Sequence, residues 1–282
     1  MNELKFVMSD LDLALLHEYA SRLQSGGKTS QEIAEAEGEP QVYRIEKQMY
    51  WGLPLGLFER RQKPMSPWLL TPLGGAFVRI YRTQRRAKLA ILECIYYNVS
   101  CNDALMRSIV HGILYPRFAS GFQKTSVSEI REWVIENSHI YRSKDEATLH
   151  RQVSIRLAAL TTRGLGTDRE CLAPLGVVER DGADIVTVTR MPDPLSAAYI
   201  LSTWWTRTWK LDAGVRAPID ALLEEGGPAR AFFLRRREVD ALLDTLYSQR
   251  VALVERVGGL DQFAISIDRG LESSIKLLES LV

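Results

Sequence analysis

The side chains that could do chemistry in this chain are mainly basic ones. The segment 79–88 reads RIYRTQRRAK and carries five cations and no acid. If the segment is one helix, cations three or four positions apart share a face, and such a face can neutralise the phosphates of a nucleic acid. The alternative is an inter-domain helix whose cations pair with acids of neighbouring segments. The five residues are Arg79, Arg82, Arg85, Arg86 and Lys88.

A second group of candidate phosphate and base contacts lies between residues 40 and 63. In VYRIEKQMYW, the residues Val42, Ile45 and Met49 recur at helical spacing, so we expect them to pack inward. The polar side chains between them would then face outward, where they could meet base edges and phosphates or simply be solvated. The candidates are Gln41, Arg44, Lys47 and Gln48 on this helix, and Arg60, Arg61 and Lys63 in the hairpin that follows.

A third group of cations lies on a predicted long helix, DEATLHRQVSIRLAALTTR, at 145–163. Arg151, Arg156 and Arg163 are its candidate phosphate contacts. Arg151 and Arg163 lie 12 positions apart, a separation that suits two phosphates across a groove better than one base step. Pairing with nearby acids is an equally good interpretation of these arginines.

Motifs of catalysis and cofactor binding are missing from the sequence. It contains no Gly-x4-Gly-Lys-Ser/Thr loop, no Gly-x-Ser-x-Gly elbow and no His-Glu-x-x-His pair. The single Glu-x-Lys, Glu3-Leu4-Lys5, has no upstream acid to complete a nuclease metal site. Cys94 and Cys101 have no histidine at zinc-ligand spacing. We therefore expect no enzymatic activity, no cofactor and no metal.

Composition restricts the class of protein. The 282 residues are 46% hydrophobic and 25% charged, which is typical of a globular chain with about two domains or three small ones. Thirty-six basic against 35 acidic residues exclude a polybasic nucleic-acid coat but permit a local basic face. Acids among the first dozen residues, three scattered cysteines and the lack of a run of about 20 apolar residues predict a cytoplasmic protein with no membrane contact.

An internal repeat indicates the organisation. PLGLFER at 54–60 returns as PLGVVER at 174–180, identical at five of seven positions, and a looser copy, ALVER, occupies 252–256. A β-prone stretch follows each copy. Asp181-Gly182 and Gly258-Gly259 join the second and third pairs, and such dipeptides favour tight turns. The sequence therefore predicts three short hairpins.

Helical patterns precede each hairpin. In the first unit, Thr29 or Ser30 can cap a short helix that Gly38 would end. Ser126 and Ser143 each begin a capping box in the second unit. The other expected helices are 10–24, 42–51, 88–99, 103–114, 195–210, 217–225, 236–249 and 271–281.

The residues at this point resemble a known family. TSQEIAEAEGEPQVYRIEKQMYWGLPLGLFERR…WLLTPLG resembles a winged helix-turn-helix of the prokaryotic transcription-factor type, in which GLFER and LTPLG are similar to the wing strands. LTTRGLGTDRECLAPLGVVERDGADIVTVTR is similar to it. The resemblance covers about 20–80 and 125–190. It implies a mainly α fold with small β-hairpin wings, built as tandem winged helix-turn-helix domains joined by helices, in which the third helix of each unit would enter the major groove.

Three domains are expected. Residues 1–80 would form the first winged helix, 81–192 the second together with a basic linker helix, and 193–282 a C-terminal helical or winged-helix-like interaction domain. Residues 211–282 contain nine basic and 12 acidic residues, a net charge of −3, which favours a protein partner for this last domain. Trp204, Trp205 and Trp209 would suit such an interface, but they are equally typical of a core.

Two functions are compatible with these features. The favoured one is non-catalytic binding of double-stranded DNA, as a transcriptional regulator or as the DNA-binding subunit of a larger prokaryotic complex such as a defence complex. The alternative is a winged-helix protein-protein adaptor that does not bind DNA directly. The helix expected at 271–281 could pack within its own chain or against a second copy, so a homodimer stays open.

Overall fold

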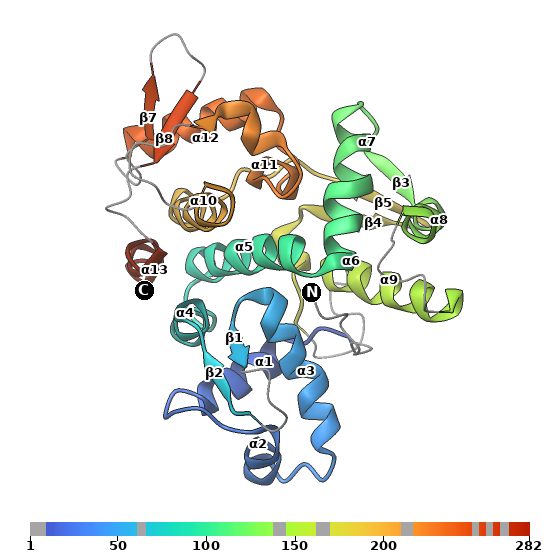
Figure 1. Cartoon of the computed structure of the whole chain (residues 1–282), viewed down its shortest axis with the longest axis vertical. Helices are drawn as coiled ribbons and strands as arrows, with labels where there is room; N and C mark the ends of the chain where they lie inside the picture. Colours follow the sequence, from blue (N-terminus) through green and yellow to red (C-terminus); the bar gives the residue numbers. More distant parts are fainter. Residues whose placement is uncertain are drawn as a thin grey trace.

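The computed structural model describes residues 10–60, 66–137, 145–161, 170–209, 217–249, 254–257, 262–265 and 271–282. These residues form a mainly helical protein in which three small antiparallel sheets lie around central helices (Figure 1). The prediction of a mainly α fold with small β-hairpins is confirmed at this level. No helix within the described residues has both the length and the apolar character needed to cross a membrane.

The first segment of the fold packs four helices against a two-stranded sheet. Asp12 caps the first helix. Thr29, one of the two predicted caps, caps the second and forms a capping box with Glu32, and Gly38 ends that helix in the left-handed region at φ 66°. The elements are α1 (Leu13–Arg22), α2 (Ser30–Glu37), α3 (Val42–Leu55), β1 (Phe58–Arg60), β2 (Trp68–Leu70) and α4 (Pro72–Ile80).

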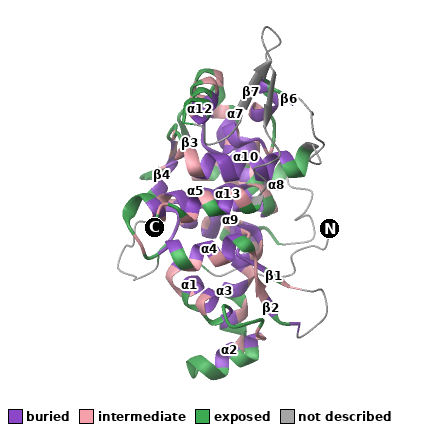
Figure 2. Cartoon of the chain, turned by 90° about the vertical axis from the view of Figure 1, so that its left-hand side faces the viewer, coloured by how far each residue is buried: buried purple, intermediate pink, exposed green. Residues whose placement is uncertain are grey.

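A long helix, α5 (Arg85–Asn102), forms the centre of the molecule. Every residue from Ala90 to Ser100 is buried, because α3, α4, α10, α11 and α13 surround the helix. Figure 2 shows this buried centre between the more exposed outer helices. After it come α6 (Ala104–Arg107), the π-helix η1 (Ser108–Leu114) and α7 (Tyr115–Ala119).

The second and third sheets repeat one arrangement. Each has three antiparallel strands, in the orders β3-β5-β4 and β6-β8-β7. The elements of the second are β3 (Lys124–Ser126), α8 (Val127–Asn137), α9 (Glu146–Thr161), η3 (Ala173–Leu175), β4 (Val178–Asp181) and β5 (Asp184–Thr187). The elements of the third are α10 (Pro194–Trp209), β6 (Ala217–Pro218), η4 (Ile219–Leu223), α11 (Pro228–Ala231), α12 (Arg236–Ser248), β7 (Val254–Val257), β8 (Gln262–Ile265) and α13 (Leu271–Glu279).

All three predicted hairpins are confirmed, and each has a further partner. A preceding strand pairs with the second strand of the hairpin in both three-stranded sheets. In the first sheet, Lys28 forms a single antiparallel bridge with Trp68 at the corresponding place. The turn of the second hairpin is centred on Gly182 and Ala183, one residue later than predicted, and Gly182 has φ 60°. Gly258-Gly259 lies outside the described residues.

Two local expectations differ from the structure. The segment 79–88 is not one helix, since α4 ends at Ile80 and α5 begins at Arg85. Thr83 stabilises the intervening turn by donating its hydroxyl hydrogen bond to the Ile80 carbonyl. Residues 217–225 form a short strand and a 3-10 helix rather than an α-helix. Ser143, the predicted start of a capping box, lies outside the described residues. At the start of α9, Asp145 accepts a hydrogen bond from the Thr148 amide.

Adjacent glycines in the first turns of α4 give a matched stability test. A Cβ atom on Gly74 would lie 2.0 Å from the Leu57 carbonyl oxygen, whereas one on Gly75 would meet only the flexible Arg79 side chain at 3.5 Å. Gly74→Ala should therefore lower the free energy of unfolding by about 1–3 kcal/mol, and Gly75→Ala should raise it by roughly 0.5–1 kcal/mol. Urea unfolding of both variants checks this, and equal effects would contradict the close packing of α4 on residue 57.

A buried histidine predicts the acid sensitivity of the core. Burial lowers the pKa of His111 from 6.5 to about 3, so the unfolded chain takes up this proton before the folded chain does. Stability from this group is complete above pH 6.5 and falls as pH is lowered, by about 2 kcal/mol at about pH 5. Urea unfolding at neutral and acid pH should show a larger loss for the natural protein than for His111→Gln. The same loss in both would show that His111 does not titrate in this way.

Candidate nucleic-acid interface

The exposed face of α3 carries two accessible cations. Ile45 and Met49 are buried, as the periodicity predicts, and Tyr43, Arg44 and Lys47 are exposed. The Lys47 Nζ lies 5.0 Å from the centre of the Tyr43 ring. The Arg44 guanidinium is 3.8 Å from a Glu39 carboxylate oxygen, and its side chain is 61% exposed. Such loose surface pairs contribute little, so both cations are available to a ligand.

The two glutamines predicted beside them differ in position. Gln48 is buried, and its amide Nε2 donates a hydrogen bond of 2.8 Å to the Asp10 carbonyl. The prediction that Gln48 is exposed is therefore wrong, because the segment before α1 covers this side of the helix. Gln41 is the residue before the first turn of α3, is half-buried, and donates its backbone N–H to Glu39 at 2.9 Å.

Arg60 is a structural residue of the first hairpin. Its side chain is only 14% exposed and donates hydrogen bonds to the Ser66 carbonyl at 3.0 Å and to the Tyr50 hydroxyl at 3.1 Å. The guanidinium carbon also lies 4.6 Å from the centre of the Trp68 ring, a cation-π distance. The prediction of Arg60 as an exposed contact is wrong for this reason. Arg61 and Lys63 lie outside the described residues.

The basic residues of 79–88 bind acids from four different parts of the chain. Since the helix is interrupted, the expected single face of arginines is wrong, and the alternative of pairing between segments is confirmed for four of the five. Arg85 alone has no ion pair or hydrogen bond with any described residue. The pairs are Arg79 with Glu279, Arg82 with Glu18 at 3.5 Å, Arg86 with Asp193 at 2.7 Å, and Lys88 with Glu170 at 2.8 Å.

The two described arginines of α9 differ in their exposure to solvent. Arg151 is exposed and makes no ion pair with a described residue. Arg156 is buried, and its Nη2 lies 2.9 Å from Oδ2 of the fully buried Asp103. The prediction of Arg156 as a phosphate contact is therefore wrong, because the fold uses its charge to compensate Asp103. Arg163 lies outside the described residues.

The structure brings the remaining cations of α3 and α9 to one region. The two helices meet where the Arg156 guanidinium carbon lies 5.4 Å from the centre of the Trp51 ring, and Figure 1 shows α9 at the right of the view with α3 below it. At 1.5 Å per residue, Arg44 is about 10 Å and Arg151 about 7 Å along its helix from this contact. Both positions therefore fit within one helical turn of B-form DNA, about 34 Å.

Acids adjoin this region on α2. Glu32 and Glu35 are exposed there, and hydrogen bonds from the Thr29 backbone and hydroxyl lower the pKa of Glu32, which keeps it anionic. Phosphates approaching α3 would have to avoid this acidic helix. The charge of the first unit is thus divided between an acidic α2 and a basic first half of α3.

The structure shows whether the tryptophans of α10 lie in the core or at a surface, and against what the closing helix α13 packs. Trp204 and Trp205 are both buried, so their interpretation as core residues is confirmed. The side chain of Trp209 lies outside the described set. Ile275 and Leu278 of α13 are buried as well, and this helix packs on α10 and α4. The closing helix therefore packs within its own chain.

One group of polar residues was not found by the sequence analysis. Glu93 of α5 accepts two hydrogen bonds from Arg190 and one from the Asp193 backbone N–H. The residues before α10 read RMPDP, and an Asp-Pro pair at the start of a helix was the available signal. That signal marks a cap, and it does not reveal that a buried carboxylate 100 positions earlier holds the segment.

Taken together, the described residues form a mainly helical protein with three small sheets and exposed cations on α3 and α9. No protein-family model matches the chain, and no curated protein matches it. Its fold is similar to a crystal structure of SspB, with a TM-score of 0.66 and 15% identity over 97% of this chain and 84% of that one. It is also similar to a magnesium-ion-bound SspB crystal structure, with a TM-score of 0.66 and 14% identity over 97% of this chain and 85% of that one. At these identities the likeness concerns the fold alone. In the described part of this chain, no group of three or more His, Cys, Asp or Glu side chains could hold a metal ion.

Two arginines on α9 provide a test of these assignments. Arg156→Met leaves the buried Asp103 carboxylate without its cation and should lower the free energy of unfolding by about 3–5 kcal/mol. Arg151→Met alters an exposed position and should change it by less than about 0.5 kcal/mol. Met and Arg have similar helix propensities, so helix formation does not confound the comparison. Urea unfolding measures both, and a stable Arg156→Met variant would overturn the structural role of Arg156.

Proposed function

We propose that this chain is a non-catalytic double-stranded DNA-binding protein built from tandem winged helix-turn-helix units. The observation that carries the proposal is the arrangement found three times along the chain, in which helices precede a hairpin whose second strand also pairs with an earlier edge segment. The sequence resemblance of 20–80 and 125–190 to winged helices supports it independently. The fold shared with the SspB structures is compatible with it and adds no information about ligands.

The proposed DNA-binding face comprises Arg44 and Lys47 of α3 and Arg151 of α9. These three cations are exposed, and their helices meet at the Trp51–Arg156 contact. In a winged helix, α3 and α9 are the helices that would face the major groove. Tyr43 adds an exposed aromatic ring beside Lys47, where it could contact a sugar or a base.

The biological setting proposed is that of a cytoplasmic regulator of transcription, or of the DNA-binding subunit of a larger prokaryotic complex. The net charge of +1 fits a protein that binds through one restricted face. Affinity would then depend on few phosphates, and sequence preference would come from side chains on α3.

A protein-protein adaptor is the second candidate, and one surface favours it. Ile135 of α8 is 37% exposed, and Phe122, which precedes β3, is 60% exposed beside the Arg117 guanidinium. Glu132 and Glu136 of α8 are exposed too. On α8, exposed acids beside an exposed apolar side chain repel phosphate and suit a basic, partly apolar protein partner.

Charge reversal on α3 tests the DNA-binding proposal. Arg44→Glu combined with Lys47→Glu should weaken binding to a mixed-sequence duplex of about 30 base pairs by at least about tenfold at low salt, and should reduce the salt slope by about 2. Both side chains are exposed, so the variant should fold. Fluorescence anisotropy across a salt series gives both quantities.

The matched control likewise reverses two exposed basic side chains, in this case both arginines. Arg82 and Arg237 lie outside the proposed face and pair only loosely with Glu18 and Glu238. Arg82→Glu combined with Arg237→Glu changes the net charge equally, so general electrostatics affects both variants alike. Equal losses in the two variants would refute the α3 assignment. A natural protein that binds no duplex at low salt would favour the adaptor.

A further inference from the structure

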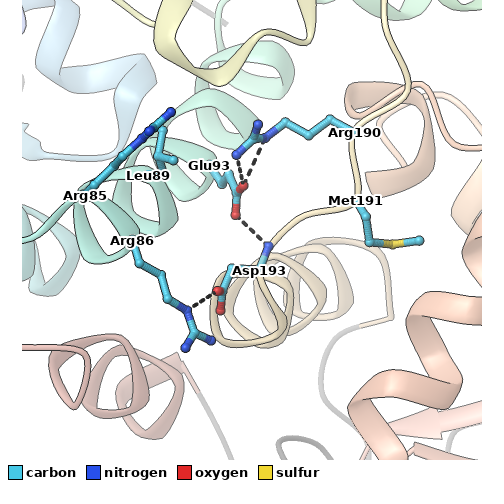
Figure 3. Close-up of a pocket in the computed structure, with 7 residues that line it drawn as sticks. All are labelled: Arg85, Arg86, Leu89, Glu93, Arg190, Met191 and Asp193. Carbon is cyan, nitrogen blue, oxygen red and sulfur yellow. Dashed lines mark hydrogen bonds and ion pairs between the residues drawn. The ribbon is translucent and has the colours of Figure 1, made fainter.

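A cleft with a volume of about 430 Å³ lies between the start of α5 and the segment that leads into α10. Figure 3 shows its lining, in which Arg85 and Arg190 extend from opposite walls toward the same side of Glu93 and Arg86 lies on the other side, against Asp193. The apolar contributions are Leu89 and Met191. The volume is within the range of pockets that hold small ligands.

The two acids of this cleft are already engaged. Glu93 is buried, and one of its carboxylate oxygens accepts from Arg190 Nε and Nη2 at 3.1 and 3.0 Å. The other accepts from the Asp193 backbone N–H at 2.8 Å and from the Ser196 hydroxyl. Asp193 in turn caps α10 through the Leu195 N–H and pairs with Arg86. Glu93 therefore holds the wall of the cleft and is not accessible to a ligand.

The cations, in contrast, remain accessible. The side chains of Arg86 and Arg190 are 63% and 28% exposed, against 16% and 2% for their partners Asp193 and Glu93. Arg190 uses Nε and Nη2 on Glu93, which leaves its Nη1 for a ligand, and Arg86 likewise bonds Asp193 through Nε. Arg85 is exposed and has no ion pair or hydrogen bond with any described residue. A ligand would therefore encounter three guanidinium groups and almost no negative charge.

We propose that this cleft binds a phosphate group between Arg85 and Arg190, with Arg86 adding charge from the opposite side. Planar guanidinium groups match the oxygens of a phosphate, and such charge-assisted hydrogen bonds are the strong ones. Arg190 is preorganised for this role because Glu93 fixes its orientation, which reduces the entropy lost on binding. Leu89 and the rim residue Met191 provide apolar contact for whatever carries the phosphate.

The phosphate could belong to a free nucleotide or to the backbone of DNA. The two sources share the chemistry that the arginines recognise, and the size of the cleft accommodates a mononucleotide or a short stretch of backbone. The inference stands apart from the proposed function, since the cleft does not include Arg44, Lys47 or Arg151. Separate variants of the cleft and of the α3–α9 face can therefore show which of the two proposals fails.

The test compares two single-charge variants of the same basic segment. Arg85→Gln removes a cation of the cleft that has no partner to lose among the described residues, and Arg82→Gln removes a similarly exposed cation outside it. The probes are inorganic phosphate, adenosine 5′-monophosphate and the duplex used above, each titrated by isothermal calorimetry at low salt. Arg85→Gln should weaken binding of the recognised probe by about tenfold or more, whereas Arg82→Gln should change it by less than about twofold.

Each result has a defined meaning. Loss of phosphate or nucleotide binding in Arg85→Gln alone supports a site for a free phosphate ligand. Loss confined to the duplex, again in Arg85→Gln alone, supports a site for the DNA backbone, and it should add to the loss from the α3 variant. Equal effects of the two variants on every probe, or binding of no probe by the natural protein, would overturn the proposal.

Discussion

The burial of residues 90–100 of α5 on all sides is the constraint on which the rest of the structure depends. A helix without a solvent-facing side must satisfy its polar side chains from its neighbours, because an unpaired buried charge is costly. Glu93 receives its partners from the segment before α10, and Asp103, which follows the helix, receives Arg156 from α9. Asn98 donates to the Leu55 carbonyl at the end of α3 and to the Tyr199 hydroxyl of α10. Each unit of the fold is thus attached to the same helix by a specific buried polar contact.

This arrangement explains why the basic stretches of the sequence do not form one basic surface. Arg60 and Arg156 occur in basic stretches, yet neither is free on the surface. Arg60 stacks over the Trp68 ring, and Arg156 forms an ion pair with the buried Asp103. The cations of 79–88 surround the junction of the units and pair with acids from α1, α13 and the segments after α9 and before α10. Such exposed pairs contribute little stability individually. Their effect is to neutralise the junction, which leaves a few separate cationic positions in place of one basic surface.

Two of these positions carry the proposals, and they differ in kind. The α3–α9 face has exposed cations on two helices that meet at the Trp51–Arg156 contact, which suits an extended ligand such as a duplex. The cleft at Arg85 and Arg190 is concave, and a buried carboxylate orders one of its arginines, which suits a single phosphate group. Glu93 both orients Arg190 in this cleft and holds the segment that leads into α10. The architecture and the candidate phosphate site therefore depend on one carboxylate.

Local sequence determined the elements whose stability is local. The cap at Thr29, the helix end at Gly38 and the three hairpins follow from residues within a few positions of one another, and the structure has all of them, with the turn of the second hairpin one residue later than predicted. Edge strands such as Ala217–Pro218 were not predictable, since two residues carry no periodicity. Tertiary structure alone decided which arginines are exposed. Arg151 and Arg156 lie five positions apart on one helix, and only the packing of that helix beside Asp103, 53 residues earlier than Arg156, makes one a surface cation and the other a buried counter-ion. The reason is physical: a side chain's hydrogen-bonding tendency is local, whereas its desolvation depends on whatever the fold places against it.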